Sequence, residues 1–144
     1  MRGALSDTRF GPFVHAQLYP GQENSGRLVT LLKQQARELA KRQGLDLVIC
    51  DGSPGVGCPV ISSLSGASLA VAVVEPTPSG RHDFERVAAL CDHFRIPVAV
   101  LINKADLNHE EVQAITRLAD DKGYTVVGAL PFDPAVTGAM IRRK

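Results

Sequence analysis

The sequence has no tryptophan, few aromatic residues and almost no excess of either charge. Of its 144 residues, 5% are aromatic, and sixteen Lys and Arg nearly balance fifteen Asp and Glu, for a formal net charge of +1. Binding to nucleic-acid backbone needs a concentrated basic face, so we expect no nucleic-acid partner. With 44% hydrophobic residues and so weak a charge, the chain is also unlike disordered proteins.

Long hydrophobic runs and paired cysteines are also missing. No apolar run approaches the ~20 residues that a bilayer span needs, so we expect no membrane span. The first ten residues, MRGALSDTRF, lack the apolar core of a signal peptide. The three cysteines (Cys50, Cys58 and Cys91) form no CxxC pair and cannot all be paired within one chain. We therefore expect a cytoplasmic protein with a single domain over residues 1–144.

Apolar runs rich in Val, Leu and Ile predict β-strands. They show no polar alternation, which is typical of parallel strands buried on both faces, and they lie at 45–50, 68–75, 97–103 and 124–130. A weaker candidate, 12–19, begins at Pro12. Helical patterns separate these runs, at 25–43, at 79–94, after a cap at Asn108 and from Pro134 towards Arg143. This order predicts a three-layer α/β fold, with a mostly parallel open sheet and helices on both faces.

In such sheets ligands bind at the carboxyl ends of the strands. The first run is followed by DGSPGVGCPV, in which Asp51 and Gly55 have the spacing of a Walker B and switch II segment. A carboxylate there holds Mg²⁺ through water, and the glycine N–H meets a terminal phosphate. The alternative is that Asp51 only caps a helix.

The third run is followed by NKAD, the guanine-reading pattern of GTPases. In that pattern Asn103 and Asp106 hydrogen-bond to a base, and Lys104 packs along it. The fourth run is followed by PFDP, residues 131–134, which is either a base-contacting loop or a turn into the last helix.

The second run is followed by PTPSGRHD, residues 76–83. Here Thr77 and Ser79 are candidate helix caps. The same helix start could instead approach a phosphate or a partner chain.

The phosphate-binding loop GxxxxGK[ST] does not occur in these 144 residues. Its nearest approach is GQENSGRL, where Arg27 stands in place of lysine and Leu28 in place of the magnesium-binding Ser or Thr. We interpret this segment as structural, or as part of the rim with Arg27 exposed.

Several strings together resemble the MinD-type ATPases, the deviant Walker A group of P-loop NTPases that includes ParA and cobyrinic acid a,c-diamide synthase. The similarity is to the subfamily that carries an inserted ferredoxin-like domain. It rests on VHAQLYPGQENSGRLVT, DGSPGVGCPVISSL, EPTPSGRHDFERV, INKADLN and GALPFD, which occur in this order and are spread over nearly the whole range of residues 10–138.

The resemblance implies a homodimer that sandwiches ATP and Mg²⁺ between its subunits. Asp51 would then be the magnesium-side acid, Gly55 the switch II glycine and Asn103 the adenine-contacting amide, helped by the loop from Pro131 to Asp133. The family generally uses ATP, so NKAD need not indicate guanine. Its phosphate loop and ferredoxin insertion are missing here, so the chain resembles the C-terminal part of such a protein, and we expect no ATP hydrolysis by this chain alone.

Cys58 follows Asp51 by seven residues, the offset of a cluster-ligating cysteine in the related nitrogenase iron protein. The resemblance implies that Cys58 could ligate a metal or an iron–sulfur cluster at a subunit interface; the alternative is a small packed thiol at a helix start. Cys50 and Cys91 are expected to fill the core.

Three functions stay open. The first is the C-terminal part of a MinD-like ATP-binding protein that serves iron–sulfur or electron-transfer biology, with an iron–sulfur or other metalloprotein as partner. The second is a catalytically inert dimerisation or protein-interaction module of the same fold. The third is GTP binding through NKAD.

Overall fold

The computed structural model describes residues 2–17 and 25–142, and the chain divides into two compact units, Met1–Gly66 and Ala67–Lys144. Each unit is described here by itself, and the single domain over 1–144 stays a prediction. Among the described residues, no helix combines the length and apolar character needed to cross a membrane.

The first unit begins with an antiparallel hairpin of β1 (Arg2–Thr8) and β2 (Gly11–Gln17). Thr8 closes the turn by donating its hydroxyl to the Gly11 carbonyl at 2.7 Å, and Gly11 takes φ +131°, which favours glycine. β2 confirms most of the strand expected at 12–19, whose last two residues lie outside the described residues. β1 was not expected, because its sequence RGALSDT has no apolar run.

Helix α1 (Ser25–Gln43) has the bounds that its sequence pattern predicts, and it packs against the short helix α2 (Cys58–Leu64). The helices approach closely at Gly26, where an added β-carbon would lie 3.1 Å from the Ser62 hydroxyl oxygen. Lys33 of α1 donates hydrogen bonds to the carbonyl oxygens of Ser62 and Ser65 at 3.1 and 2.8 Å. It thus provides a partner for carbonyl groups at the C-terminal end of α2 that have none within the helix. Burial lowers the pKa of this ammonium below its usual value.

The strand expected at 45–50 is wrong, because this run has no regular secondary structure and all six residues are exposed. Leu47 and Ile49 are 73% and 84% exposed. A strand exists only through hydrogen bonds to a neighbouring strand, and none of the described strands pairs with this segment. Cys50 is therefore exposed and not a core residue. Asp51 does not cap a helix either, because the N-cap of α2 is Gly57.

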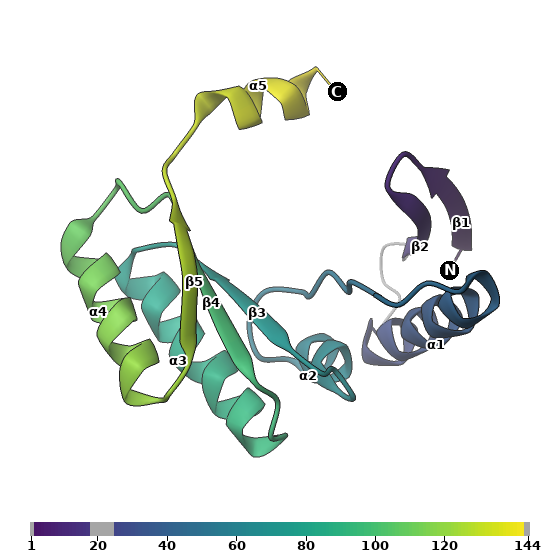
Figure 1. Ribbon diagram of the computed structural model, residues 1–144, viewed down its shortest axis with the longest axis horizontal. Helices are drawn as coiled ribbons and strands as arrows, with labels where there is room; N and C mark the ends of the chain where they lie inside the picture. Colours follow the sequence, from purple (N-terminus) through teal and green to yellow (C-terminus); the bar gives the residue numbers. More distant parts are fainter. Residues whose placement is uncertain (1, 18–24, 143–144) are drawn as a thin grey trace. The chain divides into compact units, whose positions relative to one another are not determined.

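The second unit alternates strands and helices in the expected order (Figure 1). Its elements are β3 (Ala70–Val74), α3 (Pro78–His93), β4 (Val98–Asn103), α4 (His109–Asp121), β5 (Thr125–Leu130) and α5 (Pro134–Ile141). The three strands form a parallel sheet in the order β3-β4-β5. The expectation of an α/β fold with a parallel sheet is thereby confirmed.

Helices α3 and α4 cover the same face of this sheet (Figure 1). Successive right-handed crossovers between neighbouring strands place both helices on one side. The core between them is almost free of solvent, with Val100, Ile102 and Ile115 each no more than 1% exposed. Cys91 of α3 is fully buried there, as expected.

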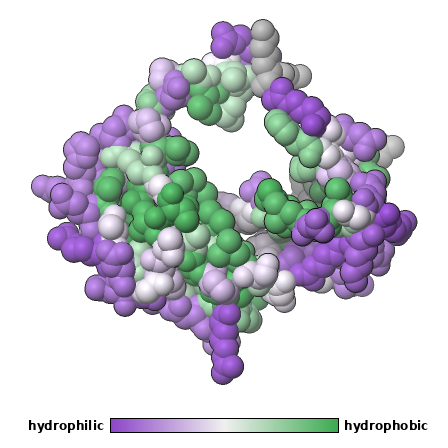
Figure 2. All heavy atoms as spheres, in the orientation of Figure 1, coloured by the Kyte–Doolittle hydropathy of each residue, from purple (hydrophilic) through white to green (hydrophobic). Residues whose placement is uncertain are grey.

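The opposite face of the sheet is open and apolar. Val71, Val73 and Val127 are 55%, 62% and 58% exposed, and Figure 2 shows hydrophobic residues gathered over this part of the unit. The outer strands β3 and β5 are thus buried on one face only, contrary to the expectation drawn from their unbroken apolar runs. The third layer, with helices on this face, stays a prediction.

Each helix of this unit that follows a strand begins at a side-chain cap. Thr77 accepts a hydrogen bond from the Gly80 N–H at 2.9 Å, Asn108 accepts from Glu110 and Glu111 at 3.1 Å, and Asp133 accepts from Ala135 at 2.8 Å. These bonds satisfy helix N–H groups that have no partner within the helix. The caps fix where the strand-end loops stop and the helices start.

At the other end of the sheet, Asp92 joins α3 to the segment that precedes β5. Its carboxylate accepts hydrogen bonds from the Tyr124 hydroxyl and from the Lys122 ammonium, the latter at 2.9 Å. These bonds, that of Tyr124 first, lower the pKa of Asp92 below its ordinary value. Burial, together with the Asp92 partner, raises the pKa of Tyr124 well above its usual range.

We expect Tyr124→Phe to lower the free energy of unfolding by about 1 kcal/mol near neutral pH, since it removes a hydrogen bond to a charged group. Asp92 contributes stability above the ordinary carboxyl pKa near ~3.9 and loses it as pH falls through its lowered pKa. Tyr124 contributes stability below the ordinary tyrosine pKa of about 10 and loses it as pH rises through its raised pKa.

The measurement is urea unfolding of both proteins across the pH range. The difference in free energy of unfolding should be largest between about pH 5 and 9 and should narrow on either side. Lys122→Gln is the control, because it removes the second partner of Asp92 and leaves the tyrosine in place. A difference that does not vary with pH would contradict this explanation.

Candidate functional site

The candidate site is the edge of the sheet where β3, β4 and β5 end. The three strands are parallel, so the segments that follow them, 75–77, 104–107 and 131–133, leave the sheet at the same edge, where Asn103 ends β4. This edge is where parallel α/β sheets bind ligands. It holds five of the predicted site residues, namely Asn103, Lys104, Asp106, Pro131 and Asp133.

The NKAD segment makes a tight turn at the end of β4. Asn103 is the last residue of the strand, and its side chain is half-buried with no hydrogen-bond partner among the described residues. Lys104 takes φ +55°, a left-handed conformation that is uncommon outside glycine. The Ala105 N–H then donates to the Leu130 carbonyl at 2.8 Å, which extends the contact of β4 with β5 into the loops.

Asp106 ties this turn to the loop after β5. Its Oδ1 accepts a hydrogen bond from the Phe132 N–H at 2.6 Å. Phe132 lies between Pro131 and Asp133, so the carboxylate holds the middle of the predicted base-contacting loop. Asp133 itself caps α5, and all three loop residues are exposed. The structure thus brings the NKAD turn and the 131–133 loop together.

Glu75 is a residue of this edge that the sequence analysis missed. It follows β3 directly, and its carboxylate pairs with the Lys104 ammonium. It is the first residue of EPTPSGRHDFERV, a string in which the sequence predicts helix caps at Thr77 and Ser79. Thr77 does cap α3, whereas Ser79 is an exposed residue of its first turn. A carboxylate and an ammonium at the ends of neighbouring strands were the available clue.

The remaining predicted residues belong to the other unit. Asp51 is exposed in a segment without regular structure, Gly55 takes φ +89°, and Cys58 is the exposed first residue of α2. A left-handed turn at Gly55 agrees with a loop that presents backbone N–H groups. Arg27 is exposed, as expected of a rim residue, while residues 21–24 of the degenerate phosphate-loop string lie outside the described residues.

Among the described residues there is no group of three or more His, Cys, Asp or Glu side chains that could hold a metal ion. Asp51 supplies one carboxylate, which suits Mg²⁺ held through water and phosphate, and Cys58 supplies one thiol. An iron–sulfur cluster needs more thiolates than this segment provides, so Cys58 could act only together with ligands from elsewhere.

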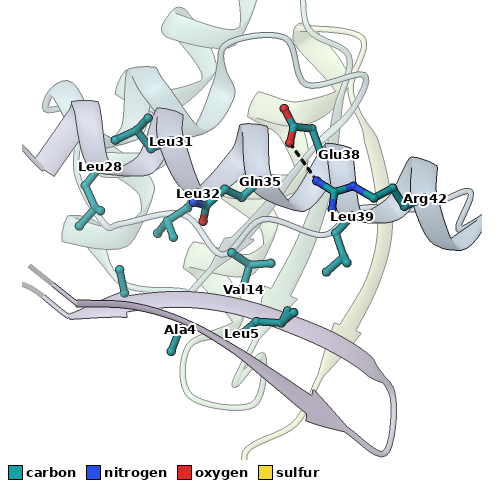
Figure 3. Close-up of a pocket in the computed structure, with 11 residues that line it drawn as sticks. Ala4, Leu5, Val14, Leu28, Leu31, Leu32, Gln35, Glu38, Leu39 and Arg42 are labelled. Carbon is teal, nitrogen blue, oxygen red and sulfur yellow. Dashed lines mark hydrogen bonds and ion pairs between the residues drawn. The ribbon is translucent and has the colours of Figure 1, made fainter.

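The first unit also contains an apolar groove of about 520 Å³ between the hairpin and α1 (Figure 3). Leu5 and Val14 line it from the hairpin, and Leu28, Leu32 and Leu39 line it from the helix. An exposed pair of Glu38 and Arg42, 3.4 Å apart, lies at one end. None of the predicted site residues lines the groove.

No family model matches the chain. It is similar to two proteins of the archaeon Methanocaldococcus jannaschii. It is 34% identical to "Uncharacterized protein MJ0578" over 98 residues, which are 68% of this chain and 34% of that protein. It is 23% identical to "Uncharacterized protein MJ0579" over 111 residues, which are 76% of this chain and 41% of that protein. The chain thus spans less than half the length of these relatives, and the activity of the whole protein is a matter for proposal.

We expect Asp106→Ala to release the loop after β5. Without the carboxylate, the Phe132 N–H loses its partner and should exchange its hydrogen about tenfold faster, which NMR measures residue by residue. Asp106→Asn keeps an oxygen acceptor and should stay close to the wild type. Equal exchange in the alanine variant and the wild type would show that this bond does not hold the loop.

The exposure of the three cysteines predicts how many of their thiols react with a thiol reagent in the native protein. Two thiols per chain, Cys50 and Cys58, should react quickly with Ellman's reagent in the native protein. Cys91 should react only after unfolding, because it is inaccessible and burial raises the pKa of its thiol. Cys50→Ser should remove one fast thiol; if it removes none, residue 50 is buried after all.

Proposed function

We propose that this chain is the C-terminal part of a MinD-like ATP-binding protein, in which the loops after β4 and β5 contact the adenine. The observation that carries the proposal is the joining of these loops by the Asp106–Phe132 and Ala105–Leu130 hydrogen bonds at the carboxyl edge of a parallel sheet. These are the segments to which the family resemblance assigns base contact.

The geometry supports a site for a planar base. The half-buried amide of Asn103 offers one donor and one acceptor side and has no partner among the described residues, so it can pair with the edge of a purine. The 131–133 loop is exposed, and it includes the Phe132 ring, which offers an apolar surface for contact with a base. Preformed loops lower the ordering cost of binding.

The family resemblance also gives roles in phosphate binding to two residues of the first unit. Asp51 would hold Mg²⁺ through water, and the Gly55 backbone would meet the terminal phosphate. The 144 residues contain no GxxxxGK[ST] loop, so hydrolysis is proposed only for a protein that has this loop as well. A homodimer in the cytoplasm, and service to an iron–sulfur or other metalloprotein with Cys58 at the interface, complete the proposal.

A catalytically inert interaction module is the second candidate. It is favoured by the open apolar face of the sheet and by α5, in which Val136, Met140 and Ile141 are 61%, 74% and 77% exposed. Exposed apolar surface of this kind is typical of protein–protein contacts.

GTP binding is the third candidate and has less support. A guanine-reading carboxylate must accept hydrogen bonds from the base, but one oxygen of Asp106 already accepts from the Phe132 N–H. We therefore assign base recognition to Asn103 and a loop-holding role to Asp106.

Isothermal titration of this chain with ADP, ATP and GTP tests the proposal. We expect both adenine nucleotides to bind more tightly than GTP, because contacts with the base distinguish adenine from guanine. Asn103→Ala should weaken ADP binding about tenfold, the effect of losing a good hydrogen bond in a partly desolvated site.

Asn108→Ser is the matched control, since serine also caps a helix and residue 108 precedes α4 rather than ending a strand. Its ADP affinity should equal that of the wild type. If none of the three nucleotides binds, the interaction module is favoured. Preferential GTP binding that Asp106→Ala abolishes would establish the third candidate.

A further inference from the structure

We infer that Glu75 is a positioning residue for the nucleotide-contacting loops and that the EPTPSG turn fixes the backbone of Glu75 for this role. This inference rests on the proposed function. Glu75 would touch no nucleotide; it acts through Lys104, which lies between Asn103 and the two residues that tie the loops together.

The turn after β3 fixes the backbone of Glu75 from several sides. The Glu75 carbonyl accepts a hydrogen bond from the Thr77 N–H at 2.8 Å, and the Thr77 hydroxyl accepts from the Gly80 N–H at 2.9 Å. Pro76 is fully buried. A β-carbon at Gly80 would overlap the Glu75 carbonyl oxygen, so only glycine permits this close approach.

The side chain of Glu75 links this fixed backbone to Lys104, which follows the neighbouring strand β4. Its carboxylate pairs with the Lys104 ammonium, and the two side chains are 45% and 34% exposed. A pair this exposed adds little to stability, so its importance lies in where it holds Lys104. That residue has the left-handed φ of +55°, a conformation that persists only when its surroundings hold it.

Three interactions therefore connect the ends of the three strands at this edge of the sheet. Glu75 holds Lys104, Ala105 bonds to Leu130, and Asp106 holds Phe132. Because these three residues of the turn are consecutive and follow Asn103, loss of the first interaction frees the turn that aims the Asn103 amide. Glu75, which follows β3, thus influences the geometry of the loops after β4 and β5.

The test is Glu75→Gln, which keeps the size of the side chain and removes its charge. Glu85→Gln is the matched control, because Glu85 is a similarly exposed glutamate of α3 that pairs with Arg81 instead. Two readouts are taken: hydrogen exchange of the Ala105 and Phe132 amides without nucleotide, and ADP affinity by titration.

We expect Glu75→Gln to speed exchange at both amides and to weaken ADP binding, each about fivefold, while Glu85→Gln changes neither. Gly80→Ala should act in the same direction, and Ser79→Ala in the same turn should not. Reversing the pair, with Glu75→Lys and Lys104→Glu together, should restore both readouts to within about twofold of the wild type.

Unchanged exchange in Glu75→Gln overturns the positioning role, whatever the nucleotide result. Faster exchange with no loss of ADP affinity also overturns it, because the loops would then not depend on the pair for binding. If the wild type binds no nucleotide while Glu75→Gln speeds exchange, the proposed function fails and the mechanical link between the loops stands.

Discussion

The hydrogen bond between the Asp106 carboxylate and the Phe132 N–H closes the carboxyl edge of the parallel sheet. Parallel strands deliver their following loops to one edge, but they do not fix those loops to each other. Here the Asp106 carboxylate, together with the Ala105–Leu130 hydrogen bond, joins the loops after β4 and β5, and the Glu75–Lys104 pair joins those after β3 and β4. The candidate site is the consequence of these two cross-connections, because without them three independent turns would leave the sheet.

Much of the second unit could be predicted from the sequence because local and long-range preferences agree there. The run at 97–103 becomes the central strand, where both neighbours pair with it, and Asn108 caps a helix as its side chain favours. The run at 45–50 is also rich in Leu, Val and Ile, but none of the described strands pairs with it, so its β propensity alone does not make it a strand. Burial on both faces failed for β3 and β5 because composition does not say what covers a sheet.

The candidate site was only partly predictable for a related reason. Asn103, Lys104 and Asp106 could be found because they lie at the end of an apolar run or within three residues after it. The partners they choose could not be found, since Glu75 and Phe132 lie 29 and 26 residues away along the chain. Strand order and loop geometry decide those pairings. For Asp106 the sequence predicts a contact with a base, and the structure adds a hydrogen bond that its carboxylate accepts from the Phe132 N–H.

The caps on α3, α4 and α5 have a consequence for how this edge can vary. Thr77, Asn108 and Asp133 all lie in, or next to, the loops of the candidate site, and each also starts a helix. A substitution that tunes ligand contacts there also alters the beginning of a structural element. Substitutions that change specificity are therefore tolerated more easily at positions such as Asn103 or Pro131, which do not cap a helix. Fewer residues of this surface can vary in evolution than its exposed area suggests.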